Sequence, residues 1–579
     1  TARSMDELDQ DKNHFSRKAI NLILGLVFTV LCSTTIAAQE YLLVVEVMDE
    51  LTQQPLESAE IIIDQCSCGG ITNNNGIFSI NLPQNTYSVH VNYIGFKSET
   101  TNVNLNSRKK IIINLVEEQE QLSEVVVRAK RINDNLELPQ MGALQLQTQE
   151  LKKIPSGLGE ADVLRSMTLL AGVNNAGEIS NGLSVRGGAL DQNLLLLDNA
   201  PVFNPTHLFG LFSVFTPDVI SSVDLYRANI PARYGGRITS VLDIKVKNPY
   251  VDKFKLSGGI GIVSSRLNIE TPIIKDKLMM TFGGRAGLTD FLLPLVSERL
   301  KDTKAKFYDS TLKLLYLPTE DDQITFTGFY SKDFYQLDLI TQIQNINAKN
   351  NQYDFKTLNG TLNWRHSFND KSNLRTFLVM SDYTPKTIFP EVDNPNEIVF
   401  ESKINYQSFA TEFSKEIKSN LDYYVGVQAN KYQIRPGELR PGNGNSVVAV
   451  SLAEENSYEF AGYGNINFKP VTNMAISAGL RFSHYVLVGP YKQAQLDQTT
   501  GLLLGVTDFE KGAGVKTYNG LEPRLGANIK LNETTSIKAS YARLNQYLQN
   551  VYNSTTPLPT SRWKTSDSNI KPQISDTYG

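Results

Sequence analysis

The chain has 579 residues, a formal net charge of −4 and 20% charged residues. This length predicts several domains, and the near-neutral balance without a basic stripe argues against nucleic acid as the main partner. The five histidines show no pair at ligand spacing, and we expect no metal and no other cofactor. No Gly-x-Ser-x-Gly and no phosphate loop occur, so we expect no enzyme activity and no catalytic residues.

The N-terminal part contains one strongly apolar segment. It reads AINLILGLVFTVLCSTTIAA (19–38) and follows the basic pair Arg17 and Lys18. A basic start, an apolar middle and small residues before Gln39 are typical of a secretory signal peptide, although a membrane-anchor helix shares these features. We therefore expect residues 1–38 to be a signal peptide with leading residues, and the mature protein to begin outside the cytoplasm.

Residues 39–116 contain short runs in which apolar and polar residues alternate. The runs are LLVVEVMD, AEIIID, GIFSINL, YSVHVNYIGF and KIIINLV, and turn residues separate them. Short strands at this spacing predict a small β-sandwich. The stretches DELTQQPLESA (49–59), TNNNGIFSI and YIGF resemble the carboxypeptidase-regulatory-like domain. That resemblance implies a spacer or docking module with no chemistry of its own.

A linker follows at 117–130 and ends in EVVVRAK, which runs from Glu124 to Lys130. The first part, VEEQEQLSE, is acidic and has no apolar period. The three consecutive valines favour an extended strand. This strand is either the last strand of the sandwich or a segment offered to a partner by strand addition, in which backbone hydrogen bonds supply much of the affinity.

Residues 131–249 have a mixed pattern that predicts a small α+β domain. The stretch GEADVLRSMTLLAG (159–172) has a helical apolar period, and Gly172 is placed to cap its C-terminus. The stretch TPDVISSV, with Thr216 as N-cap and Pro217 at the first position, predicts a second helix. Short strands are expected in GLSVRG, NLLLLD, SVDLYRA and SVLDIKVK.

Four consecutive leucines, Leu194 to Leu197, stand between the motif RGG and the turn DNAP. We expect these leucines to form a strand that is buried in the core of the α+β domain. We expect the DNAP turn to reverse the chain through Asx-type hydrogen bonding and the fixed φ of proline. The aspartates on either side, Asp191 and Asp198, are expected to have structural roles.

From residue 250 onward the pattern is a strict alternation between an apolar face and a hydrophilic or small-residue face. In TLNGTLNWRHSF (357–368), every second residue from Leu358 to Phe368 lies on one face. Every second residue from Thr357 to Ser367 lies on the opposite face. In MAISAGLRFSHYV (474–486), Leu480 and Phe482 oppose Arg481 and Ser483. This alternation over hundreds of residues is typical of a transmembrane β-barrel in an outer membrane, whereas a large soluble β protein explains only part of it.

The connections in this region fall into two classes. Six short polar turns lie at 274–277, 319–322, 369–372, 418–420, 469–473 and 532–534, and longer loops lie at 336–352, 385–397, 436–455 and 488–519. Short turns on one rim and long loops on the other are typical of the periplasmic and extracellular sides. Six short turns imply six hairpins and therefore about twelve strands. The predicted fold class is thus mainly β, with a sandwich, an α+β domain and an antiparallel barrel at 250–579.

The stretch from Ser184 to Lys247, SVRGGALDQNLLLLDNAPVFNPTHLFGLFSVFTPDVISSVDLYRANIPARYGGRITSVLDIKVK, resembles the plug domain of TonB-dependent outer-membrane receptors. The order of domains resembles Bacteroidetes members, which carry a carboxypeptidase-regulatory-like domain in front. Large transporter barrels of about 22 strands have a plugged lumen. We therefore expect a plug inside a barrel, and a chain that is truncated at its C-terminus.

The resemblance also implies roles for single residues. The TonB box corresponds to Glu124, Val125, Val126, Val127, Arg128 and Ala129. Arg186 and Arg237 match plug arginines that meet glutamates of the inner barrel wall, and Glu412 and Glu459 are candidate partners. An arginine fork pairs bidentately with a carboxylate, although both arginines could instead be ordinary solvated charges. Phe203, Asn204 and His207 lie in APVFNPTHLFG, a candidate ligand-facing loop of the plug.

The implied function is active import of a scarce ligand across the outer membrane. The TonB energy-coupling complex would bind the TonB box by strand addition and use the proton-motive force to move the plug. Expected partners are therefore TonB, outer-membrane lipid and a small ligand, and the sandwich and the TonB box are expected in the periplasm. Iron-siderophores, cobalamin, peptides and oligosaccharides all stay open as ligands.

Two other functions stay open. A signal-transducing receptor of this family would carry a front domain of mixed α/β type, whereas this chain has a β-sandwich pattern. A passive pore or adhesin would not need the EVVVRA segment. SusC-like glycan importers usually follow the valines with GYG, which is absent here, and this weakens but does not remove the case for a surface lipoprotein partner.

Overall fold

The computed structural model describes most of the chain after residue 39. The described residues are 40–50, 53–66, 68–93, 96–116, 142–154, 161–175, 182–261, 263–288, 298, 302–337, 342–343, 346–392, 395–442, 447–497, 499–532, 534–551 and 562–579. The predicted signal peptide (1–38) and the predicted TonB box (Glu124 to Ala129) lie outside them. The chain forms two compact units, and each is described by itself.

The first unit is a sandwich of two sheets. One sheet has the order β4(Ile77–Pro83)–β1(Glu40–Asp49)–β7(Lys109–Leu115), and the other has the order β3(Cys68–Ile71)–β2(Glu60–Ile63)–β5(Asn85–Asn92)–β6(Glu99–Leu105). Alternate apolar residues of both sheets form one buried cluster that includes Val45, Ile61 and Val89. The predicted sandwich is confirmed. β3 and β6 were not predicted, because CGGI and ETTNVNL carry few apolar residues. Cys66 and Cys68 form a disulfide, with 5.1 Å between their Cα atoms.

The second unit contains a small domain, here called the plug region (described residues of 142–249). Its five-stranded sheet has the order β12(Ala200–Pro201)–β11(Asn193–Leu197)–β16(Ser240–Val246)–β15(Ile220–Tyr226)–β8(Ala143–Gln147). The further elements are α3(Thr148–Lys153), α4(Val163–Met167), β9(Val173–Asn175), β10(Leu183–Val185), η2(Leu190–Gln192), β13(Thr206–His207), η3(Leu208–Gly210), β14(Phe212–Ser213) and η4(Pro217–Val219).

The four leucines form the buried strand β11, as predicted. Leu195 and Leu197 belong to the main buried cluster of the plug region, whereas Leu196 belongs to a second cluster on the other face of the sheet. β11 pairs with β16 in parallel. Because this strand is covered on both faces, its apolar residues run continuously instead of alternating with polar ones.

Two local predictions for the plug region were wrong. The DNAP turn reverses the chain because Asp198 and Asn199 both have positive φ, +45° and +73°, as in a two-residue type I′ hairpin. The second predicted helix is only the 3₁₀ turn η4, and the residues after it enter β15. β15 pairs with both β8 and β16, so sheet pairing outweighs the local helical signal.

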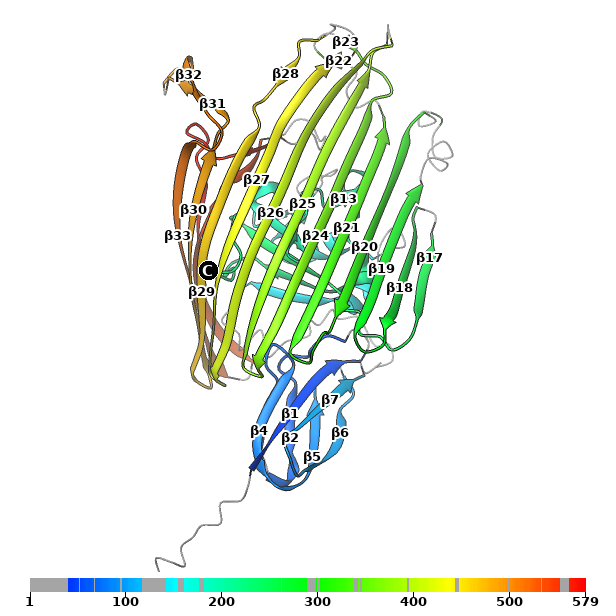
Figure 1. Cartoon of the computed structure of the whole chain (residues 1–579), viewed down its shortest axis with the longest axis vertical. Helices are drawn as coiled ribbons and strands as arrows, with labels where there is room; N and C mark the ends of the chain where they lie inside the picture. Colours follow the sequence, from blue (N-terminus) through cyan, green and yellow to red (C-terminus); the bar gives the residue numbers. More distant parts are fainter. Residues whose placement is uncertain are drawn as a thin grey trace, which may run out of the picture. The chain divides into compact units, whose positions relative to one another are not determined.

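Most of the rest of the second unit forms one antiparallel sheet, here called the large sheet (Figure 1). Its path is β17(Lys255–Ile260), β18(Ser265–Ile274), β19(Leu278–Leu288), β20(Lys304–Tyr316), β21(Asp322–Gln336), β24(Gln352–Asn369), β25(Ser372–Pro390), β26(Glu397–Lys418), β27(Leu421–Pro441), β29(Glu455–Val471), β30(Met474–Val488), β33(Gly514–Asn532), β34(Thr535–Gln546) and β37(Gln573–Tyr578). β28(Val450–Ser451) also pairs with β27.

All six predicted short turns join neighbouring strands of the large sheet. β17 and β37 extend the path beyond the twelve strands of these hairpins. The long connections carry the small pairs β22(Gln342–Ile343)–β23(Ile346–Asn347), β31(Tyr491–Leu496)–β32(Leu503–Phe509) and β35(Leu548–Val551)–β36(Arg562–Thr565). Several strands also run further into the predicted loops, since β25 continues to Pro390 and β27 to Pro441.

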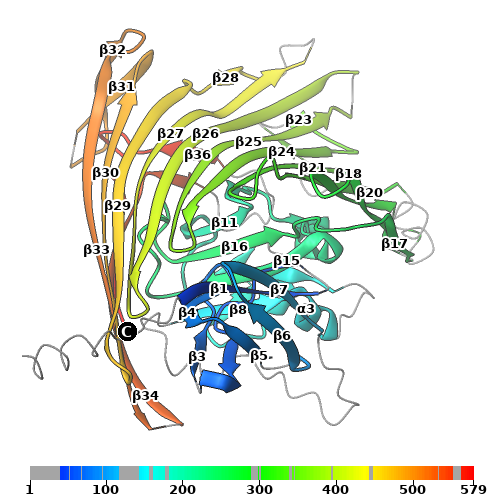
Figure 2. The ribbon, with the colours of Figure 1, turned by 60° about the horizontal axis from the view of Figure 1, so that its bottom comes forward.

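The two faces of the large sheet differ as the alternation predicted. Leu358 and Phe482 are exposed, at 41% and 47%, whereas Thr357 and Arg481 are buried on the opposite face. The plug region lies on the concave side of the curved sheet (Figure 2), and Phe329 of β21 belongs to its main buried cluster. Among the described residues, no helix combines the length and the apolar character needed to span a membrane.

Candidate functional site

The plug region contacts the large sheet through the segment IPARYGGR (230–237), which lies between β15 and β16. Arg233 carries the side-chain contact. Its Nη2 lies 3.2 Å from Oε1 of Glu412 on β26, and its guanidinium carbon lies 4.3 Å from the ring centre of Tyr424 on β27. Glu412 is almost fully buried. An ion pair therefore joins the plug region to the inner face of the sheet.

Two arginines of the sheet, here called the arginine pair (Arg481 and Arg524), contact the backbone of the same segment. Nη1 of Arg524 donates to the carbonyl oxygen of Ile230 at 3.0 Å and also to that of Pro231. Nη1 of Arg481 donates to the carbonyl oxygen of Arg233 at 3.4 Å. Three carbonyl groups of the plug segment thus accept hydrogen bonds from β30 and β33.

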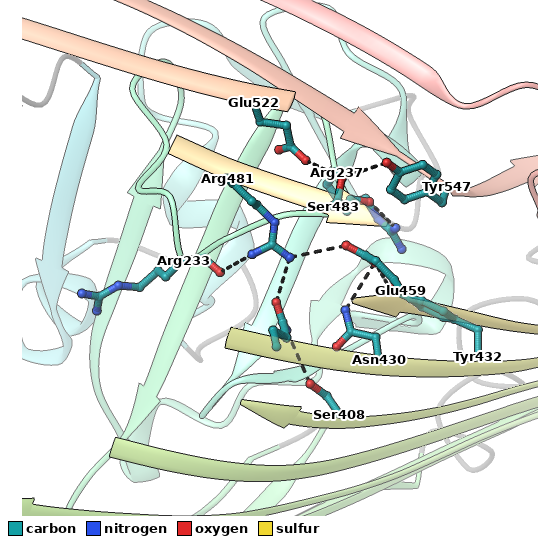
Figure 3. Close-up of polar contacts among 12 residues, drawn as sticks. Arg233, Arg237, Ser408, Asn430, Tyr432, Glu459, Arg481, Ser483, Glu522 and Tyr547 are labelled. Carbon is teal, nitrogen blue, oxygen red and sulfur yellow. Dashed lines mark hydrogen bonds and ion pairs between the residues drawn. The ribbon is translucent and has the colours of Figure 1, made fainter. Parts of the chain in front are cut away.

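Each arginine of the pair has a buried carboxylate beside it. Arg481 Nη2 lies 3.4 Å from Glu459 Oε1, and Arg524 Nη2 lies 2.8 Å from Glu522 Oε2. All four side chains are 1% exposed. Figure 3 shows Arg481 pointing between Glu459 and the backbone of Arg233. A buried charge needs such pairing, because removing an ion from water costs several kcal/mol.

Gly235 allows Arg481 to come this close. A Cβ added at Gly235 would lie 2.4 Å from Nε and 2.6 Å from Cζ of Arg481. The arginine would have to leave its place against the plug segment. The sequence IPARYGG therefore needs a residue without a side chain at this position.

Replacing Gly235 with alanine is expected to lower the unfolding free energy by about 1–3 kcal/mol, the usual range for overpacking a filled contact. Thermal unfolding of the purified protein in detergent measures this change. Gly360→Ala is the matched control, since a Cβ there meets nothing within 4 Å. Equal melting temperatures for the two variants would contradict the contact described for Gly235.

The predicted arginines do not form the predicted pairs. Arg186 is exposed in a left-handed turn, with φ of +51°. Arg237 is buried, but its Nη1 donates to the carbonyl oxygen of Gly236 and its guanidinium lies 5.3 Å from the ring centre of Trp563. Among the described residues neither forms an ion pair with Glu412 or Glu459. Arg186 lies in an exposed turn and Arg237 lies over the Trp563 ring, and Arg233 takes the position at Glu412.

Glu459 has other partners besides Arg481. It accepts hydrogen bonds from Asn430 Nδ2 at 3.3 Å and from the Tyr432 hydroxyl at 3.2 Å. Figure 3 shows these side chains converging from neighbouring strands. Glu412 and Glu459 thus both lie in the plug–sheet contact, and the sequence could have indicated Arg481 as well, since it occupies an inward position of the alternation.

The loop chosen as ligand-facing packs against Trp563 of β36 and against strands of the large sheet. Phe203 lies edge-on to Trp563, with 5.4 Å between ring centres. Asn204 is buried and its Nδ2 lies 3.5 Å from Asp333 Oδ2 of β21. His207 is fully buried and contacts carboxylates on two strands. In this structure the ring of His207 is therefore not available to a ligand from outside.

The sequence interpretation also missed the buried ion pair between Asp198 and Lys313. Asp198, in the turn after β11, lies with Oδ2 2.9 Å from Nζ of Lys313 on β20. The same oxygen accepts a hydrogen bond from Thr327 Oγ1, and Oδ1 accepts one from the amide of Val246. The inward position of Lys313 in the strand alternation was a usable signal, because a lysine facing the interior needs a partner.

Comparisons with known proteins agree with this architecture. Three family models match the chain: the CarboxypepD_reg-like domain over residues 46–127, the TonB-dependent receptor plug domain over 145–240, and the TonB-dependent receptor-like β-barrel over 300–579. The chain belongs to the TonB-dependent receptor family. A search of curated protein sequences found no significant match.

Solved structures of similar fold include one transporter and two receptors. The copper transporter OprC has 11% identity and a TM-score of 0.53, over 75% of this chain and 69% of its own. The ferric yersiniabactin uptake receptor FyuA from Yersinia pestis has 14% identity and a TM-score of 0.53, over 76% of this chain and 69% of its own. The alcaligin receptor FauA from Bordetella pertussis has 15% identity and a TM-score of 0.51, over 76% of this chain and 67% of its own. At these identities the likeness shows that this receptor shares their fold.

Proposed function

We propose that this receptor imports a scarce ligand actively across the outer membrane, by TonB-driven displacement of the plug region. The observation that carries this proposal is the set of buried charged contacts that hold the plug region on the inner face of the sheet. Breaking one buried pair typically costs about 3–5 kcal/mol. Several such contacts must break before a path through the plug region opens. Thermal motion alone rarely breaks them together, so an external source of work is required.

The order of the plug strands supports pulling from the N-terminal side. In the described part of the plug sheet, β8 pairs with β15 alone. The register is antiparallel and begins with Ala143 opposite Tyr226. The TonB box, Glu124 to Ala129, precedes β8 in the sequence. Tension applied there reaches the Ala143 end first, so the strand separates one residue pair at a time instead of all at once.

The roles of the other parts follow from this mechanism. The β-sandwich and the TonB box stand in the periplasm, where TonB adds a strand to the valine-rich segment. The apolar outer face of the large sheet contacts outer-membrane lipid. The ligand binds at the long loops on the opposite rim from the short turns. No covalent step is needed, because the work is mechanical.

Replacing Val126 with proline tests the energy coupling. Proline has no backbone N–H and cannot complete the added strand, so affinity for the purified periplasmic domain of TonB should fall at least about tenfold, which corresponds to about 1.4 kcal/mol. Surface plasmon resonance on the detergent-solubilised receptor measures it. Val126→Ile, which keeps the backbone donor, should bind like the parent. Equal binding by the proline variant would contradict strand addition at this segment.

A further inference from the structure

The imidazole of His207 occupies a fully enclosed position between the plug region and the sheet. It belongs to the short hairpin formed by β13 and β14, and its side chain is 0% exposed. The ring stacks on Phe307 of β20, with 4.4 Å between ring centres. The hairpin β13–β14 is therefore packed directly against the inner face of the large sheet.

Both ring nitrogens of His207 face carboxylates. Nδ1 lies 2.7 Å from Asp333 Oδ1 on β21, and Nε2 lies 3.1 Å from Asp309 Oδ2 on β20. An ionised carboxylate only accepts hydrogen bonds, so the ring must donate from both nitrogens. A neutral imidazole donates from one nitrogen, whereas an imidazolium donates from both. The geometry therefore fits the charged form of His207.

The charges around the ring balance only with that form. Arg285 on β19 lies with Nε 2.8 Å from Asp309 Oδ2, and its Nη2 donates to the carbonyl oxygen of Ser213 in β14. Two carboxylates and one guanidinium leave one negative charge, which an imidazolium cancels. Thr216 Oγ1 donates to the other oxygen of Asp309 at 2.6 Å and adds no charge.

Three further titratable groups near the cluster, Tyr335, Tyr383 and Asp162, are neutral or already paired. The Tyr335 hydroxyl on β21 donates to Asp333 and accepts from the backbone amide of Leu208. Tyr383 on β25 belongs to the same buried cluster as Tyr335. Asp162, before α4, accepts hydrogen bonds from the amides of Ser213 and Arg165. None of these groups supplies a positive charge in place of His207.

We propose that His207 is a positioning residue that controls plug movement. As an imidazolium it holds the hairpin β13–β14 against β20 and β21, and when it loses its proton that hairpin is released. The arginine pair, on the strands β30 and β33, keeps its charge at all accessible pH values. The link to transport rests on the proposed import function, whereas the charge of the ring does not.

The direction of the pH effect follows from the contacts. Burial by itself would lower the pKa of His207, but Asp333 and Asp309 outweigh burial and hold the pKa of His207 above its ordinary value. A group whose pKa is raised on folding stabilises fully below its unfolded pKa, about 6.5 for histidine. The stabilisation is lost as the pH rises through the folded pKa. The hairpin should therefore loosen on the alkaline side.

Nitrogen NMR of the full-length receptor in nanodiscs, labelled at histidine, reports the charge directly. The signals of the His207 ring are assigned as those that disappear in the spectrum of His207→Gln. Both ring nitrogens should keep the chemical shifts of an imidazolium above pH 7. Asp333→Asn, which removes one charge of the cluster, should lower its titration midpoint by at least about one pH unit. Thr216→Val, which removes only a neutral hydrogen bond, should shift it much less. A neutral ring at pH 7, or no effect of Asp333→Asn, would overturn the proposal.

Hairpin release is measured separately with a cysteine probe. Ser213 is 1% exposed, whereas Leu211 in the same hairpin is 51% exposed. Both variants, Ser213→Cys and Leu211→Cys, are labelled with a maleimide at each pH. The ratio of their labelling rates removes the pH dependence of thiol reactivity, which both share. This ratio should rise about tenfold between pH 6 and pH 9, and it should be high and flat when His207→Gln is added. A flat ratio with His207 present would contradict release. Both readouts omit TonB, so failure of the import function leaves them unaffected.

Discussion

Replacing Arg524 with alanine is expected to lower the unfolding free energy by about 3–5 kcal/mol, the range for removing one partner of a buried ion pair. The variant leaves Glu522 as a buried charge without its guanidinium partner. It also removes the donor to the carbonyl oxygens of Ile230 and Pro231. The plug segment should detach from β33, and the rest of the sheet should persist.

Two measurements separate this effect from general unfolding. Thermal unfolding in detergent gives the loss of stability, and limited proteolysis followed by mass spectrometry shows whether cleavage concentrates within the plug region. The matched control is Arg440→Ala, because the pair of Arg440 with Glu401 is half-exposed and such pairs contribute about 0–1 kcal/mol. Cleavage spread evenly over the sheet would argue that Arg524 supports the sheet and does not hold the plug.

Replacing Asp198 with asparagine is the second large expected effect. The change keeps the shape and tolerates the positive φ of this position, since asparagine adopts it readily. It leaves the ammonium group of Lys313 buried without a carboxylate, so the unfolding free energy should fall by about 3–5 kcal/mol. Adding Lys313→Met to Asp198→Asn should recover much of the loss, because neither charge then remains buried.

The pH dependence gives an independent check of the same pair. Burial would raise the pKa of Asp198, but Lys313 and Lys245 outweigh it, and the pKa of Asp198 lies below its ordinary value. A depressed carboxyl pKa stabilises the fold above the unfolded pKa of about 3.9, and this stabilisation is lost as the pH falls through the folded pKa. The parent should therefore lose more stability in acid than Asp198→Asn. A double-mutant cycle with additive effects would show that the two residues do not interact.

Local sequence determined the classes of structure and their order along this chain. Strand alternation separated outward residues such as Leu358 from inward residues such as Arg481, because successive side chains of a strand point to opposite faces. Polar turns located six of the hairpins of the large sheet. Continuous apolar sequence from Leu194 to Leu197 indicated a buried strand, and β11 is covered on both faces of the plug sheet.

Tertiary structure alone decided which charged groups meet. The local sequence does not distinguish Arg186, Arg233 and Arg237 as partners of a carboxylate, yet only Arg233 reaches Glu412. A left-handed turn exposes Arg186, and contact with Trp563 holds Arg237. The ion pairs of His207 and Asp198 join residues more than a hundred positions apart. Such pairs depend on strand register, on the curvature of the sheet and on where the plug segment lies against it. These are properties of the assembled fold, and no local pattern of residues encodes them.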